Sequence, residues 1–270
     1  ISSSDNGSDC YSSDYADEKL YQDRNVMEKN CDDDAYRKWS SLRIATRWQR
    51  ILSDDTSFSI TPYFRVNQME FRQHYLPSKA IEENSHYSVG VASNYYWQID
   101  PSLALVMGID VEWTDGELVQ TQEKPDTYSW GKARQQGIHY DYEVEASTIA
   151  PYIQGDWQVN EVLKFTGSIR FDATQYRYNN LVADGTTKAD GSSCVNNSDE
   201  AIPCLFQRPS DSDDRFNNTS TKLGFNYQLG TDTALFGTWS QGFRAPQTTD
   251  LYRLQKQQLV GEIDSEEINS

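Results

Sequence analysis

The chain has 270 residues with 41 Asp and Glu against 24 Lys and Arg, so its formal net charge is −17, and its mean hydropathy is −0.77. No apolar run approaches the ~20 residues that a membrane-spanning helix needs, which excludes a helical membrane protein. Seven Trp and seventeen Tyr argue against a disordered acidic tail. The negative charge argues against a nucleic-acid partner, because that affinity comes mainly from Lys and Arg.

The two ends of the chain carry little hydrophobic pattern. Residue 1 is Ile, and the opening run of Ser, Asp, Asn and Gly has neither the basic nor the apolar region of a signal peptide. The last residues, 264–270, are polar and complete no element. We therefore expect these 270 residues to be a fragment, with a loop region at 1–40 and the folded part at 41–270.

From about residue 41 onward the hydrophobic pattern has a period of two, which is typical of β-strands with one apolar face. The clearest segment is 163–173, whose apolar face holds Leu163, Phe165, Gly167, Ile169, Phe171 and Ala173. Its polar face holds Lys164, Thr166, Ser168, Arg170 and Asp172. In total we predict eight strands, at 41–52, 56–71, 86–99, 103–117, 147–159, 162–178, 219–229 and 233–241. The eighth strand has no clean alternation, so we assign none of its residues to an apolar face.

The connections between the predicted strands alternate strictly between short and long. Short turns rich in Asp, Asn, Pro and Gly lie at 53–55, 100–102, 160–161 and 230–232. Longer connections lie near 72–85, 118–146 and 179–218. Alternation of this kind, with apolar-out and polar-in strands, is typical of outer-membrane β-barrels, which have short periplasmic turns and long extracellular loops.

Aromatic residues near both ends of the strands support a barrel, because such proteins carry aromatic girdles at both interfaces. Trp48, Trp97, Trp157 and Tyr227 lie near the short turns, and Phe71, Tyr87, Trp113 and Tyr176 lie near the long loops. The alternative is a soluble β-sandwich, whose apolar faces would pack on each other. Strands of 11–17 residues are long for such a fold, whose usual strands have about 5–6 residues. The sequence therefore favours an all-β, membrane-spanning antiparallel β-barrel.

Two segments indicate a family. The run Ala234–Pro246, which contains Gly242, Phe243, Arg244, Ala245 and Pro246, is followed by Asp250-Leu251-Tyr252 and by Glu266–Ser270. It resembles the "Y-S-x-G-F-R-A-P…L…PE…N" stretch of TonB-dependent outer-membrane receptors. The run Ala150–Trp157, followed by Leu163–Asp172, is similar to the strand pair "Y-x-Q-x-x-W…L…G-x-R-x-D" of the same family. Two positions depart from it: Ser265 stands at the usual Pro, and Gln241 at a frequent Arg.

This resemblance implies a fragment of about eight strands from a larger, 22-stranded barrel, located in the outer membrane of a Gram-negative bacterium. A plug domain, not recognisable in this chain, would fill the barrel and couple to the TonB energy-coupling complex. The expected function is energised uptake of a scarce solute, most often a ferric siderophore and in other members cobalamin, haem or oligosaccharides. The other expected partners are outer-membrane lipid and lipopolysaccharide.

Two further functions stay open at this point. Eight strands can also close by themselves or belong to a porin, which would make the protein a passive channel or a small structural barrel. A secreted β-sandwich that binds carbohydrate is the other alternative. A plug with a TonB box upstream would favour the receptor, and solubility without detergent would favour the sandwich.

Four cysteines lie in predicted loops, at Cys10, Cys31, Cys194 and Cys204. No C-x-x-C pair or suitably spaced His accompanies them, so disulfides are the preferred interpretation over zinc. Proximity favours Cys10–Cys31 and Cys194–Cys204, although four cysteines allow three connectivities.

No catalytic, metal or cofactor motif is recognisable. The three histidines, His74, His86 and His139, are scattered without a positioned nucleophile or carboxylate. Acidic runs at 32–34 and 211–214 lack the spacing of a calcium loop. We therefore predict that the chain is not an enzyme and holds no metal or cofactor.

Cations on the polar strand faces have a structural and a functional interpretation. Arg43, Arg47, Lys164, Arg170 and Lys222 lie opposite apolar faces, and we expect them to pair with carboxylates such as Asp172 inside the barrel. Loop aromatics and cations suit an anionic chelate better, through stacking and charge-assisted hydrogen bonds. The predicted ligand-binding residues are Trp130, Tyr140, Tyr142, Phe206, Arg208 and Arg244.

The negative charge is concentrated in the predicted loops. Residues 1–40, 72–86, 118–146, 179–218 and 242–270 hold 29 acids and 16 bases, a net charge of −13, and the remaining residues hold 12 acids and 8 bases. The acidity is therefore expected on surfaces that face outward from the cell.

Overall fold

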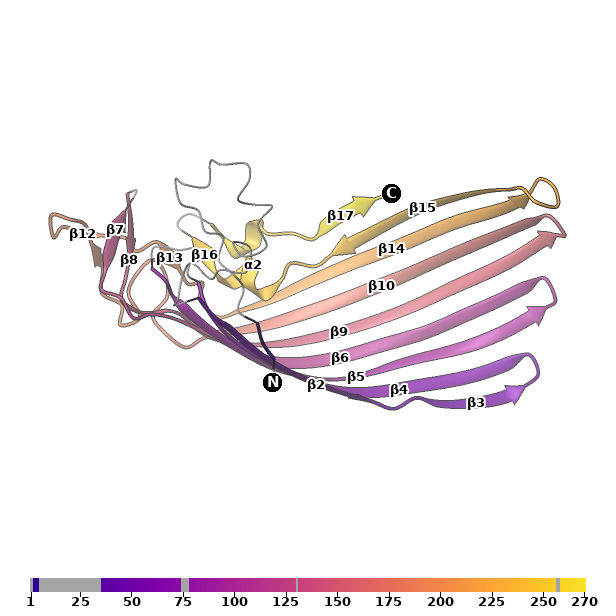
Figure 1. The fold of residues 1–270 in the computed structure, drawn as a ribbon, viewed down its shortest axis with the longest axis horizontal. Coiled ribbons are helices and arrows are strands. Elements are labelled where there is room, and N and C mark those ends of the chain that lie inside the picture. The colour runs from indigo at the N-terminus through magenta and orange to yellow at the C-terminus, as the bar shows by residue number, and fades with distance from the viewer. Residues whose placement is uncertain (1, 5–34, 74–77, 130, 256–257) are drawn as a thin grey trace, which may run out of the picture.

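The computed structural model describes residues 2–4, 35–73, 78–129, 131–255 and 258–270. Eleven strands form one antiparallel sheet, in the order β1-β2-β4-β5-β6-β9-β10-β14-β15-β17, with β3 also paired to β4. Figure 1 shows the long strands running side by side, with the short turns at one end and the loops at the other. Within the described residues β1 and β17 form the two edges and do not pair with each other. The predicted all-β antiparallel fold is confirmed, as an open sheet.

All eight predicted strands are present, and most extend further than predicted. The sheet strands are β1 (Ser2–Ser4), β2 (Arg37–Ala45), β3 (Trp48–Ser53), β4 (Thr56–Arg72), β5 (Ile81–Asp100), β6 (Leu103–Gln122), β9 (Gly137–Asn160), β10 (Leu163–Asn180), β14 (Ser212–Gln228), β15 (Ala234–Arg244) and β17 (Glu266–Asn269). The first predicted strand is divided into β2 and β3. β2 begins at Arg37, within the last residues of the predicted loop region 1–40.

The predicted long connections were too long because the strands change polarity toward the loop end. Near the short turns the sheet has an apolar outer face, which carries Phe64, Val111, Ile149 and Ile169, and a polar inner face, which carries Arg65, Glu112 and Arg170. Near the loop end the inner face becomes apolar and buried, at Leu118, Tyr140, Tyr142, Val144, Tyr178 and Phe216. The outer face there carries charged residues, among them Glu117, Glu143, Glu145, Arg177 and Asp213. A search for one continuous hydrophobic phase therefore ends each strand too early.

Two glycines on the inner face accept a tyrosine ring from a neighbouring strand. A Cβ atom on Gly90 would lie 2.3 Å from Tyr63, and one on Gly108 would lie 2.6 Å from Tyr152. The Tyr152 hydroxyl donates a hydrogen bond to the backbone oxygen of Ser93 at 3.2 Å. Absence of a side chain at these two positions lets each ring lie flat on the sheet.

Smaller elements gather at the loop end. They are β7 (Thr127–Ser129) with β8 (Lys132–Arg134), β11 (Cys194–Val195) with β12 (Ala201–Ile202), β13 (Phe206–Gln207) with β16 (Leu254–Gln255), the helix α2 (Thr248–Tyr252) and the 3₁₀ turn η3 (Val260–Glu262). In Figure 1, α2 and β16 lie over the sheet, while β7, β8 and β12 project beyond it. No helix in the described part of the chain is long and apolar enough to cross a membrane.

Candidate functional site

The inner face of β4, β5 and β6 carries a connected polar network. Arg65 Nη2 lies 3.1 Å from Glu112 Oε1 and donates to Ser88 Oγ at the same distance. Glu112 also accepts hydrogen bonds from the Tyr63 hydroxyl and the Thr114 hydroxyl. The cation at Arg65 is thus balanced by a carboxylate two strands away.

A second ion pair links β6 and β10. Arg170 Nη1 lies 2.6 Å from Asp110 Oδ2, and Arg170 Nε lies 3.0 Å from Asp172 Oδ1. The predicted pairing of Arg170 with Asp172 is confirmed. The ring of Tyr152 lies beneath this guanidinium, 5.8 Å from its carbon to the ring centroid.

Residues 245–255 and 258–263, which we call the inward loop, follow β15 and lie on the inner face at the loop end. The Tyr252 hydroxyl donates to Asp214 Oδ2 on β14 at 2.7 Å, and the Tyr140 hydroxyl of β9 donates to the Leu254 oxygen at 2.6 Å. Arg253 Nη1 reaches Glu82 Oε2 on β5 at 2.7 Å. The loop is therefore attached to β5, β9 and β14, of which the first and the last are four positions apart in the sheet.

An apolar core forms between the inward loop, residues 181–211 and the strands beneath them. Leu251 and Tyr252 are fully buried, and the ring of Tyr252 stacks on that of Tyr178 with centroids 4.1 Å apart. Leu205 and Phe206 belong to the same core. Phe206 stacks on His139 at 3.9 Å. The inward loop and residues 181–211 together are named the loop layer.

Four of the predicted ligand-binding residues are buried where the loop layer packs on the sheet. Tyr140, Tyr142, Phe206 and Arg208 are all buried. Arg208 donates to the backbone oxygens of Ala183, His139, Thr187 and Lys188, at 2.6–3.0 Å. These contacts tie Arg208 to the loop layer and to β9, so a direct cargo contact would require this layer to open. Trp130 lies outside the described residues.

Arg244 is the predicted ligand-binding residue that remains half exposed. Its Nε lies 3.2 Å from Glu266 Oε2, and its Nη2 lies 3.9 Å from Asp250 Oδ2. These two pairs join β15, β17 and the inward loop. The side chain therefore meets solvent, with its charge balanced by two carboxylates.

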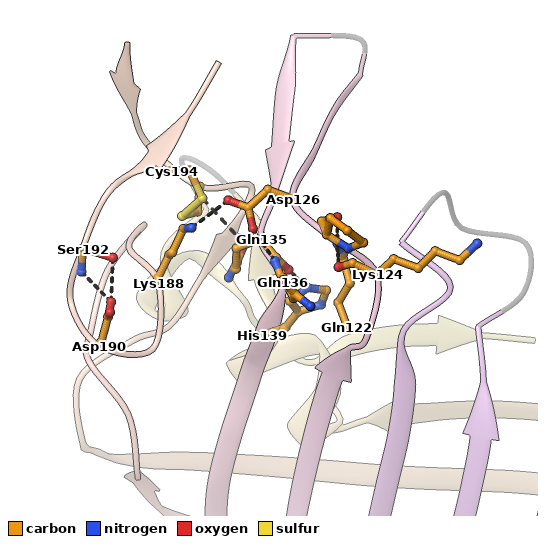
Figure 2. A network of polar contacts seen from close by, with 12 residues as sticks. Gln122, Lys124, Asp126, Gln135, Gln136, His139, Lys188, Asp190, Ser192 and Cys194 are labelled. Carbon is orange, nitrogen blue, oxygen red and sulfur yellow. Dashed lines mark hydrogen bonds and ion pairs between the residues drawn. A yellow bond between two sulfur atoms is a disulfide. The ribbon is translucent and has the colours of Figure 1, made fainter. Parts of the chain in front are cut away.

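A disulfide joins Cys194 to Cys204 within residues 181–211. Both side chains are buried, beside Ala133 and Ile202. Figure 2 shows the polar contacts around them, in which Lys188 reaches Asp126 at 2.7 Å and Ser192 donates to Asp190. Cys10 and Cys31 lie outside the described residues.

His139 is held neutral in this layer. Burial lowers the pKa of His139 to about 4, and the nearby cations Arg208, Arg253 and Arg134 act in the same direction. Its Nε2 lies 2.8 Å from the Gln135 oxygen and donates to it, while Nδ1 is buried without a hydrogen-bond partner (Figure 2). These contacts are structural and leave the ring no contact with a catalytic group.

Carboxylates crowd the outer face at the loop end. Burial raises the pKa of Asp141, and the neighbouring carboxylates of Glu143 and Glu117 raise it further. This crowding makes the outer rim a region of negative potential. No group of three or more His, Cys, Asp or Glu in the described residues is placed to hold a metal ion.

A cavity of about 600 Å³ lies between α2 and the inner face of the sheet, and we name it the sub-helix pocket. Its roof is Gln247, Thr248 and Thr249 of the inward loop. Its floor and walls come from β4, β5, β6, β9 and β10, at Arg65, Asn84, His86, Glu112, Thr114, Leu118, Tyr142 and Tyr176. The pocket is therefore polar on the side of β4 to β6 and aromatic on the side of β9 and β10.

The comparisons with known proteins give one family. The family model described as "TonB dependent receptor-like, beta-barrel" matches residues 2–269. The chain belongs to this family of TonB-dependent receptors. The family predicted from the Gly242–Pro246 motif is confirmed, whereas a search of curated protein sequences found no match.

Solved structures of TonB-dependent receptors have the same fold. The chain is similar to the ferric-catecholate import receptor Fiu from E. coli K12 (TM-score 0.54, 14% identity, 79% of this chain and 34% of that one). It is also similar to the copper transporter OprC (0.58, 12%, 87% and 35%) and to the ferric yersiniabactin uptake receptor FyuA from Yersinia pestis (0.51, 13%, 78% and 29%). The chain spans about a third of the length of these structures. At such low identity the likeness shows the fold alone.

The motif of the TonB-dependent receptors ends β15 and starts the inward loop. Gly242, Phe243 and Arg244 pair with Ile268, Glu267 and Glu266 of β17. The backbone oxygen of Pro246 accepts a hydrogen bond from Tyr176 at 3.2 Å. The motif thus lies where the chain turns from the sheet edge onto the inner face.

Sequence reasoning did not assign roles to the residues that attach the inward loop. Glu82 was placed in a connection, and Arg253 follows the family motif without a pattern of its own. Their pairing joins residues 171 positions apart, and no local spacing indicates it. Of the attaching residues Glu82, Arg253 and Tyr252, only Tyr252 was marked by the sequence, because it belongs to the family motif.

Proposed function

We propose that this chain is part of an outer-membrane receptor of a Gram-negative bacterium, which imports a scarce small solute. Uptake is energised by the TonB complex, acting through a plug domain inside the barrel. The observation that carries this proposal is the family match over residues 2–269. An iron chelate is the first candidate for the cargo, as in the names of Fiu and FyuA, and copper in the name of OprC marks a second metal in the family.

The loop layer supports a receptor over a passive channel. A pore that admits solutes by diffusion needs an open aqueous path, whereas here the inward loop crosses the inner face and is buried at Leu251, Tyr252 and Leu254. The alternative of a β-sandwich is not supported, since no second large sheet packs on the first within the described residues.

Lipid and lipopolysaccharide are the proposed surroundings of the outer face. The exposed apolar side chains of Ile149, Ile153, Ile169 and Phe171 lie together on β9 and β10. Exposing so many apolar side chains to water would be unfavourable, and outward apolar bands of this kind face hydrocarbon in barrels. The acidic rim above them would then lie at the level of the lipid head groups.

Uptake by the full-length receptor tests this function. A strain lacking its own iron receptors would express the full-length gene, and uptake of radiolabelled ferric chelates would be measured with and without TonB. We expect uptake that is lost when TonB is deleted or when the proton gradient is collapsed with a protonophore. Uptake that persists in both conditions would identify a passive channel and refute the proposal.

For the five predicted ligand-binding residues that the structure describes, we propose two roles. Arg244 stays a candidate for cargo contact, because it is half exposed. Tyr140, Tyr142, Phe206 and Arg208 would act by holding the loop layer in place. Alanine at Arg208 should then expose residues 181–211 to protease, and a role in direct contact would instead weaken binding with the layer intact.

A further inference from the structure

The sub-helix pocket offers hydrogen bonds without a free positive charge. Arg65 and Glu112, each about one third exposed, neutralise each other at 3.1 Å on its floor. His86 Nε2 accepts a hydrogen bond from Asn67 Nδ2 at 2.9 Å, and the roof adds the hydroxyls of Thr248 and Thr249. A ligand in this pocket meets hydroxyl, amide and imidazole groups and a balanced ion pair.

The other arginines at the loop end also have hydrogen-bond or ion-pair partners. Arg253 lies against Glu82, and the carboxylate of Glu82 is 4% exposed and also accepts from Gln73 and Asn84. Arg244 has two carboxylate partners, and Arg208 is buried among backbone oxygens. A polyanionic ligand would have to separate one of these pairs before it gained a charge-assisted hydrogen bond, and an unpaired carboxylate left behind is costly.

The surroundings of the pocket add negative potential. The pocket lies at the loop end of the sheet, beneath α2. Outward carboxylates at Asp141, Glu143 and Glu145 lie at the same end. A charged mouth concentrates ligands of the opposite sign and repels those of the same sign.

The roof of the pocket is fixed to the wall. The loop that carries Thr248 and Thr249 is held by the Tyr252–Asp214 hydrogen bond, the Arg253–Glu82 ion pair and the pairing of β16 with β13. Tyr252 and Leu254 are buried on the strands beneath. The pocket is therefore formed before a ligand arrives, which lowers the entropic cost of binding.

We propose that the sub-helix pocket is a cargo subsite, and that its cargo is a neutral or cationic chelate rich in hydrogen-bonding groups. This inference rests on the proposed receptor function. A trianionic chelate is disfavoured. The specificity-determining residues are Arg65, Glu112 and His86 on the wall and Thr249 in the roof.

Binding of two chelates of opposite charge tests this inference. The purified full-length receptor would be titrated, by intrinsic Trp fluorescence, with ferrioxamine B, a cationic ferric trihydroxamate, and with a trianionic ferric tris-catecholate. We expect the cationic chelate to bind at least about tenfold more tightly at low salt, with the difference shrinking as salt is added. A receptor that binds the trianion equally or more tightly, or that binds neither chelate, overturns the inference.

Variants locate the effect in the pocket. Glu112→Gln leaves Arg65 unbalanced and should shift the preference toward the trianion by about fivefold, the effect of one exposed charge pair. Glu161→Gln, the same chemical change in the short turn between β9 and β10 at the other end of the strands, should leave the preference unchanged. Thr249→Phe fills the pocket and should weaken the cationic chelate several-fold.

Folding is checked by the mobility of each unheated variant in SDS gels. If Glu112→Gln fails to fold, Thr249→Phe alone tests the inference, because it changes no wall residue. An unchanged affinity of Thr249→Phe for the cationic chelate refutes the subsite. The inference and the receptor function fail separately. TonB-dependent uptake together with a preference for the trianion refutes only the cargo class, whereas uptake that does not depend on TonB refutes the function.

Discussion

At the scale of single residues, the hydrogen bonds of two buried polar side chains, His139 and Arg208, stabilise the loop layer. His139 is fully buried, stacks on Phe206 and places one hydrogen bond on the Gln135 oxygen. Arg208 donates hydrogen bonds to the backbone oxygens of Ala183, Thr187 and Lys188 in the loop layer. His139 stabilises the layer as a neutral ring, and Arg208 stabilises it as a charged guanidinium.

The first prediction concerns pH. The folded pKa of His139 is about 4, below the ordinary value of 6.5, so the unfolded layer binds a proton first as the pH falls. Stability of the layer should therefore decrease between about pH 6.5 and 4, by up to about 3 kcal/mol. Hydrogen exchange of residues 181–211, corrected for intrinsic rates, measures this. In His139→Gln, which retains a donor for Gln135, the pH dependence should be smaller; an equal dependence would assign it to another group.

The second prediction concerns the glycine at position 108. A Cβ atom there would lie 2.1 Å from the backbone oxygen of Ser93 and 2.6 Å from the ring of Tyr152. Gly108→Ala should therefore destabilise the sheet by about 1–3 kcal/mol through overpacking. The control is Gly224→Ala on β14, whose Cβ would meet its nearest atoms at 3.5 Å. Urea unfolding of the full-length receptor, followed by gel mobility, compares the two, and equal midpoints would contradict the prediction.

At the scale of elements, the inward loop behaves as part of the wall. Its helix α2 has five residues, too few to be stable alone, so its position depends on tertiary contacts. Those contacts come from β5, β9 and β14, and from β13 through β16. The loop and the strands should therefore open together.

The third prediction removes one attachment. In Arg253→Met the carboxylate of Glu82 stays buried without its cation, which should destabilise the inward loop by about 3 kcal/mol. Limited proteolysis within residues 245–263 is expected to accelerate. The double variant Arg253→Met with Glu82→Gln should recover part of the resistance, because no buried charge then lacks a partner. Resistance equal to the unchanged receptor in the single variant would show that the pair is not an attachment.

At the scale of the whole molecule, the sheet has opposite polarity at its two ends. Near the short turns it is apolar outside and polar inside, and at the loop end it is charged outside and apolar inside. The first arrangement fits a wall between hydrocarbon and a wet interior. The second fits a wall between water and the loop layer.

The fourth prediction compares the two faces of one strand. Ile153 is on the outer face, midway along the apolar part of β9, and Gln154 is next to it on the inner face. Ile153→Arg should destabilise the receptor in lipid by about 2–4 kcal/mol, the cost of Arg at the middle of a bilayer. Gln154→Arg should cost far less, since its side chain meets the polar interior. Similar losses of folded protein in liposomes for both variants would contradict this orientation.

Much of the sheet could be predicted from local pattern. The strand 163–173 alternates without exception, and its register with β9 and β14 follows from the turn at 160–161 and the paired faces. The upper part of β9 could not be predicted in this way. There Tyr140, Tyr142 and Val144 are buried by residues 205–206 and 251–254, which are far away in the sequence.

The sequence by itself determined the strands, their alternating turns, the family and the unbalanced negative charge, because each of these depends on neighbours along the chain. The tertiary structure alone decided which residues the loop layer buries. It buries four predicted ligand-binding residues, and it joins Glu82 to Arg253 and roofs a pocket with Thr248 and Thr249. The physical reason is that a loop gains its stability from apolar contacts and ion pairs with distant strands, and no period along the chain records those contacts.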